Sequence, residues 1–82
     1  FRTVKAKVVH REPKRAAEWI RRLMDACGTD MRLRLDCNRL YTFSDAHYVL
    51  SALSSENVEY VEEPLERFDG ESYRRLFREL SI

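Results

Sequence analysis

The 82-residue sequence contains few residues that interrupt or cross-link a chain, with two glycines, two prolines and two cysteines. Because glycine and proline are scarce, no stretch reads as a linker, and we expect at most one small domain. Cys27 and Cys37 have neither the spacing of zinc ligands nor that of a redox pair. We therefore expect both to be reduced packing residues in a cytoplasmic protein.

The sequence also lacks an excess of either charge. Its 15 basic and 14 acidic residues give a net charge of +1, which argues against a nucleic acid or an anionic membrane as the main partner. No apolar run approaches the roughly 18 residues of a membrane span, and the start does not resemble a signal peptide. Because it begins inside a strand pattern without a methionine, we expect the sequence to be a piece of a longer protein.

What the sequence does contain is a strand pattern followed by a helix pattern, three times over. Residues 3–9 alternate in polarity, and residues 31–36 and 58–62 are further short strand-like runs. A helical apolar stripe follows each run, and these stripes end near Gly28, Leu53 and Leu80. This order predicts an α/β fold of three consecutive βα units, with parallel strands and the helices on one face.

Residues that can carry chemistry recur at the ends of the predicted strands. Lys5-Ala6-Lys7 ends the first strand, Asp36 the second and Glu62 the third. They are roughly thirty residues apart, as in a (β/α)8 barrel that spends about 250 residues on eight units. Such a barrel holds its active site at the C-terminal ends of its strands. We therefore predict that residues 1–82 form a partial (β/α) barrel domain of an enzyme.

Asp36 and Glu62, on neighbouring predicted strands, can each offer an oxygen to one cation. Alternation favours Glu62 over Glu63 for this purpose, because Glu63 falls on the helix-facing side of its strand. Hard oxygen ligands favour Mg²⁺, with Mn²⁺ as the alternative, over zinc. Since Mg²⁺ takes about six ligands, we expect a third acidic ligand from a later strand outside these residues, together with water and substrate oxygens.

Lys7 is placed to act as a general base toward a substrate bound to such a metal. The like charge of Lys5, a nearby divalent cation and partial desolvation all favour the neutral amine that a base needs. A metal bound to the substrate carboxylate would stabilise the dianion that forms when the adjacent C–H loses its proton. These residues therefore indicate proton abstraction α to the carboxylate of a small-molecule substrate.

The three predicted strand ends also resemble a known family. Lys5-Ala6-Lys7, Asp36-Cys37-Asn38 and Glu62-Glu63-Pro64 are similar, in order and in interval, to the Lys-x-Lys, Asp-x-Asn and Glu-Glu-Pro motifs of the enolase superfamily, muconate-lactonizing branch. In that family the motifs end the second, third and fourth strands of the barrel. The resemblance implies a lysine base and a Mg²⁺-stabilised ene-diolate, with a capping domain and the remainder of the barrel outside these residues.

Residue by residue, the resemblance implies that Lys7 is the acid/base and that Lys5 is its supporting neighbour. It also implies that Asp36 and Glu62 are Mg²⁺ ligands. Asn38 would support these ligands without binding the metal itself.

Within the superfamily, residues 33–39, followed by an aromatic residue and Thr42, are most similar to o-succinylbenzoate synthase. That resemblance implies a lyase that forms o-succinylbenzoate by dehydration in menaquinone or phylloquinone biosynthesis. The same base and ligands would equally serve a dipeptide epimerase, an N-acylamino acid racemase or a cycloisomerase. A different class also stays open, namely a non-catalytic small α/β interaction module that could associate with itself through its uncovered sheet face.

We predict that the isolated 82-residue chain is inactive, because two carboxylates cannot complete a Mg²⁺ site. By resemblance it also lacks a later-strand lysine and the capping domain. An assay of the isolated chain with the substrate of o-succinylbenzoate synthase should show no product above background, and measurable dehydration would contradict the prediction.

Overall fold

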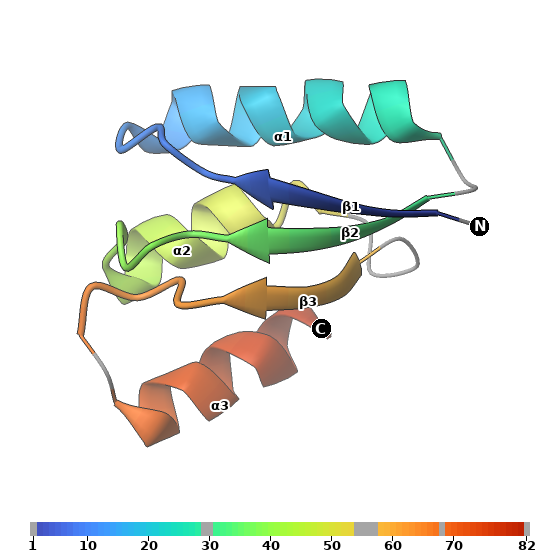
Figure 1. Ribbon diagram of the computed structural model, residues 1–82. Helices are drawn as coiled ribbons and strands as arrows, with labels where there is room; N and C mark the ends of the chain where they lie inside the picture. Colours follow the sequence, from blue (N-terminus) through green and yellow to red (C-terminus); the bar gives the residue numbers. More distant parts are fainter. Residues whose placement is uncertain (1, 29–30, 54–57, 68, 82) are drawn as a thin grey trace.

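The computed structural model describes residues 2–28, 31–53, 58–67 and 69–81, and it contains three strands that alternate with three helices along the chain (Figure 1). None of the described helices has the length and apolar character that a membrane crossing requires. In chain order, the elements are β1 (Arg2–Lys7), α1 (Pro13–Cys27), β2 (Met31–Asp36), α2 (Phe43–Leu50), β3 (Val58–Glu62) and α3 (Gly70–Leu80).

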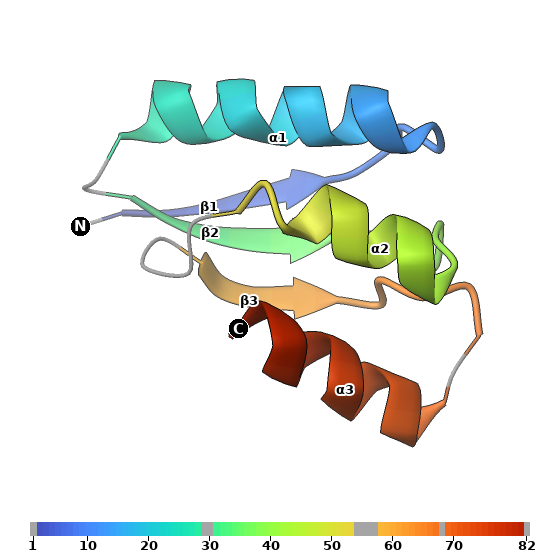
Figure 2. The same cartoon turned by 180° about the vertical axis from the view of Figure 1, so that it is seen from behind.

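The three strands form one parallel sheet in the order β1-β2-β3. Figure 2 shows α2 in front of the sheet, between α1 and α3, whereas in Figure 1 the strands lie in front of α2. Leu33 and Leu35 of β2 are buried on the helix side, and Lys5 and Lys7 of β1 are exposed on the other. The predicted α/β fold of consecutive βα units is thus confirmed, as an arrangement that matches part of a (β/α) barrel.

Side chains cap the start of each helix. The carboxylate of Glu12 accepts hydrogen bonds from the N–H groups of Lys14 and Arg15 at 3.1 and 3.0 Å, and these bonds hold the pKa of Glu12 below its usual value. Thr42 accepts from the N–H of the third residue after it at 3.2 Å, and Asp69 from that of the second at 3.1 Å. These caps satisfy N–H groups that a helix start leaves unpaired.

Two predicted element ends differ from the structure. The first strand ends at Lys7 rather than at residue 9, because the last ladder bond is the one from the N–H of Val8 to the carbonyl of Asp36, at 2.8 Å. The second helix ends at Leu50. Beyond it, the N–H of Leu53 bonds the carbonyl three residues back at 3.0 Å, which is a tighter turn than the α-helix has, and Leu53 still packs against the core.

The core lies between the sheet and the three helices, as the apolar stripes predict. Cys37, directly after β2, is fully buried in it, and Cys27 is half-buried at the end of α1. Both are free thiols, in agreement with their predicted packing role. The largest side chains with almost no exposed surface are Tyr41, Ile20, Leu35, Leu50 and Leu76.

Two neighbours on α2 provide a test of this packing. Val49 is fully buried, whereas the larger side chain of Tyr48 is 45% exposed. We predict that Val49→Ala lowers the free energy of unfolding by about 1 to 3 kcal/mol. Tyr48→Ala should change it by less than about 0.5 kcal/mol. Urea unfolding of the complete protein that contains this chain measures both, and a larger loss for Tyr48→Ala would contradict this assignment of faces.

The Cys37 thiol provides a second test. Burial, with a smaller contribution from the charge of Asp36, raises the pKa of Cys37 to about 12. At pH 8 the reactive thiolate is therefore on the order of one part in ten thousand. We predict that iodoacetamide leaves Cys37 unlabelled in the folded protein at pH 8 and that labelling accelerates as the pH rises. Peptide mapping by mass spectrometry measures this, with the urea-unfolded protein as the fully labelled control; equal rates in both states would contradict the prediction.

Candidate active site

The strand register places the predicted base and the two predicted metal ligands side by side. Lys7 pairs with Asp36 across β1 and β2, and Asp36 pairs with Glu62 across β2 and β3. Neighbouring strands lie about 4.8 Å apart, so these residues form one row across the C-terminal end of the sheet. We call Lys7, Asp36 and Glu62 the acid–base row. All three line a hollow of about 240 Å³ and carry side chains that are exposed or half-buried.

A second row lies on the same face of the sheet, two residues closer to the N-terminal end of each strand. It consists of Lys5, Arg34 and Tyr60, which are paired across the sheet and line the same hollow. The Arg34 guanidinium lies over the Tyr60 ring, 5.3 Å from its centre. Its Nη2 also pairs with Glu59 Oε1 at 2.9 Å, and this hydrogen bond raises the pKa of Arg34. The lining of the hollow therefore includes a cation–aromatic pair beside a lysine.

The Arg34–Glu59 ion pair depends on an irregularity that sequence analysis missed. Leu33 pairs with Val58 but Arg34 pairs with Tyr60, so Glu59 is an extra residue in β3. A β-bulge of this kind changes the direction of nearby side chains. Strict alternation would assign Glu59 to the helix-facing side, whereas the structure pairs it with Arg34. No signal in the β3 segment alone indicates a bulge.

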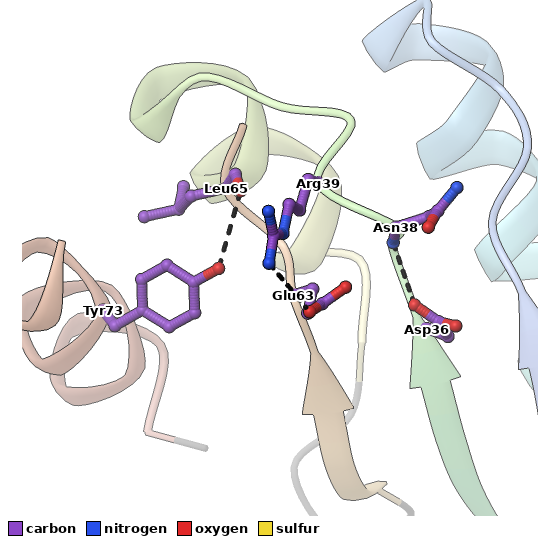
Figure 3. A network of polar contacts seen from close by, with 6 residues as sticks. All are labelled: Asp36, Asn38, Arg39, Glu63, Leu65 and Tyr73. Carbon is purple, nitrogen blue, oxygen red and sulfur yellow. Dashed lines mark hydrogen bonds and ion pairs between the residues drawn. The ribbon is translucent and has the colours of Figure 1, made fainter. Parts of the chain in front are cut away.

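Asp36 is oriented by the turn that follows it. Its Oδ1 accepts a hydrogen bond from the main-chain N–H of Asn38 at 2.9 Å (Figure 3). The side-chain amide of Asn38 points away from Asp36. Asn38 therefore contacts the carboxylate through its backbone, and its positive φ of 49° suits an asparagine better than most residues. The predicted role of Asn38, to support the metal ligands without binding the metal itself, stays a prediction.

Glu63 does not lie where alternation predicts. It has a positive φ of 46°, which ends the alternation of β3 at Glu62. Its half-exposed carboxylate pairs with Nη2 of Arg39 at 3.5 Å (Figure 3) instead of packing against the helix layer. The prediction for Glu63 was wrong because a left-handed residue turns the chain at that point. The place of Glu62 in the acid–base row is unaffected.

The donor atoms at this end of the sheet fit part of a Mg²⁺ shell. Asp36 and Glu62 supply carboxylate oxygens from adjacent strands, and hard oxygen donors are what Mg²⁺ prefers. Within the described part of the chain, no cluster of three or more His, Cys, Asp or Glu side chains could hold a metal ion. That Asp36 and Glu62 bind a metal ion stays a prediction from the sequence.

Comparison with known proteins identifies a family and a curated relative. Residues 1–82 match the family described as enolase C-terminal domain-like. The chain is also similar to a hydrophobic dipeptide epimerase from Enterococcus faecalis, with 36% identity over 55 residues. That stretch covers 67% of this chain and 16% of the relative, so the chain spans a small part of the length of that protein. Because the family match extends over the full sequence, the chain belongs to the enolase C-terminal domain-like family of the enolase superfamily.

Proposed function

We propose that this chain supplies the base and two metal ligands of a Mg²⁺-dependent enzyme that removes a proton α to a carboxylate. The observation that supports this most directly is the acid–base row, in which Lys7, Asp36 and Glu62 are consecutive partners across three strands. An amine and two carboxylates at one end of a parallel sheet, beside a hollow of about 240 Å³, suit a small anionic substrate. The proposal extends to the whole protein, of which the remainder of the barrel and the capping domain are expected parts.

Lys7 would take the proton from the carbon next to the substrate carboxylate. Lys5 lies on the same face, two residues earlier in β1. Lys7 is exposed in this chain, and closure of the site by the rest of the protein would remove water from around it.

Asp36 and Glu62 would hold the metal ion, with Mn²⁺ as the alternative to Mg²⁺. Enolase-superfamily sites pair a lysine or histidine base with Mg²⁺. When bound, the ion would supply positive charge to the substrate carboxylate as the proton leaves. The hydrogen bond from the N–H of Asn38 to Oδ1 of Asp36 holds the Asp36 carboxylate in one orientation.

Two reactions of this class have specific support. The segment Asp36-Cys37-Asn38-Arg39 resembles o-succinylbenzoate synthase, which favours dehydration. The similarity to a hydrophobic dipeptide epimerase favours epimerisation of a dipeptide. Both reactions begin with the same proton abstraction, so the acid–base row serves either, and the product formed by the complete protein distinguishes them.

We predict that the complete protein containing this chain catalyses one of these two reactions and that EDTA abolishes it. Lys7→Ala and Asp36→Asn should each lower kcat by roughly 10²-fold or more, because each removes a group on which proton abstraction depends. The assays measure o-succinylbenzoate formation and the epimerisation of hydrophobic dipeptides, with and without added Mg²⁺.

Lys14→Ala is the matched control, because Lys14 is an exposed lysine of α1 outside the acid–base row. It should leave kcat unchanged. Near-normal turnover of Lys7→Ala would remove Lys7 from the role of base. Full activity in EDTA would remove the metal from the proposal, and epimerisation without dehydration would decide between the two reactions.

A further inference from the structure

Tyr41 lies between β2 and α2, outside both elements, and it contacts the loops that follow all three strands. Its hydroxyl donates a hydrogen bond to the main-chain carbonyl of His10, in the loop after β1. Its N–H donates to the carbonyl of Pro64 at 3.2 Å, and its carbonyl accepts from the N–H of Glu66 at 2.7 Å. A residue in the loop after β2 thus holds the loop after β1 by its side chain and the loop after β3 by its backbone.

The Tyr41 side chain is rigidly placed. Only 1% of its surface is exposed, and the ring packs in the core. Burial is the main reason that the pKa of Tyr41 lies well above its usual value, with smaller contributions from Cys37 and Asp45. The hydroxyl therefore stays protonated and remains a donor to His10 throughout the pH range of ordinary enzyme assays.

The contacts of Tyr41 lie a few residues beyond the acid–base row. His10 is in the segment that leaves β1 after Lys7, and Pro64 follows Glu62 at the end of β3. On the row itself, the N–H of Cys37 bonds the carbonyl of Glu62 at 2.9 Å. The loop after β1 is therefore held by the bond from the N–H of Val8 to Asp36 and by the Tyr41 hydroxyl. The loop after β3 is held by the backbone of Tyr41 and by further bonds, among them the one from the N–H of Arg39 to the carbonyl of Glu63 at 2.7 Å.

We infer that Tyr41 is a positioning residue whose hydroxyl fixes the loop after β1, and with it the placement of Lys7 against Asp36 and Glu62. The catalytic consequence rests on the proposed function, whereas the loop tether does not. The two tethers are separable, because replacing Tyr41 with phenylalanine removes the hydroxyl and leaves both backbone hydrogen bonds in place. The loop after β1 should then loosen while the loop after β3 stays as it is.

Hydrogen–deuterium exchange of the complete protein tests the tether directly. Tyr41→Phe should accelerate amide exchange in residues 8–12 by about tenfold, as expected for the loss of one buried hydrogen bond. Residues 37–41 and 63–66 should exchange as in the wild type. Tyr48→Phe is the control, because Tyr48 is 45% exposed on α2, and it should change none of these rates. Unchanged exchange in residues 8–12 would overturn the inference whatever the activity.

Kinetics test the positioning role, using whichever reaction the complete protein catalyses. Tyr41→Phe should lower kcat/KM by about tenfold and shift the pH profile of kcat/KM, because the surroundings of Lys7 change. The Mg²⁺ concentration for half-maximal activity should stay the same, because the backbone hydrogen bonds between Tyr41 and the loop after β3 remain. A protein that is merely less folded would keep the wild-type pH profile.

Faster exchange in residues 8–12 with an unchanged kcat/KM and pH profile would overturn the role of Tyr41 in positioning Lys7. If neither reaction occurs at all, the proposed function fails. The exchange result still shows whether the Tyr41 hydroxyl holds the loop after β1.

Discussion

The register of the parallel sheet is the constraint on which the rest of the site depends. Lys7, Asp36 and Glu62 share a row only because β1, β2 and β3 pair at these positions. A shift of one residue would turn every side chain of a strand to the other face. The buried Leu33 and Leu35 oppose such a shift, since it would expose them and bury charged neighbours. The apolar face thus fixes the placement of the polar one.

The backbone just beyond β2 and β3 adopts defined turns that continue from the paired strand ends. Asn38, Arg39 and Glu63 all have positive φ angles, at a cost of roughly 1–3 kcal/mol for each residue held there. Local contacts offset that cost: the N–H of Asn38 bonds Asp36 at 2.9 Å, and the N–H of Arg39 bonds the carbonyl of Glu63 at 2.7 Å. Such conformations concentrate at functional sites, and here they flank two of the three residues of the acid–base row.

Sequence patterns predicted the features that follow from local periodicity along the chain. They predicted few of the features that depend on how the strands pair with one another. The order of the six elements, the buried Cys37 and the face shared by Lys7 and Glu62 follow from periods of 2 and 3.6 along the chain. The extra residue Glu59 does not, because a bulge is defined only by the partner strand. The tether by Tyr41 was missed for the same kind of reason: its partners lie in loops that come together only after folding.

The charges around the hollow bear on what it binds. Arg34 is compensated by Glu59 at 2.9 Å, so its positive charge is largely cancelled. Asp36 and Glu62 would be neutralised by a bound divalent cation, since two carboxylates balance its charge. The positive charge of Lys5 then remains beside the hollow, where it attracts an anionic substrate. The carboxylate of the proposed substrate would thus be drawn toward Lys5, two residues before the proposed base Lys7 in β1, and this holds for either of the two proposed reactions.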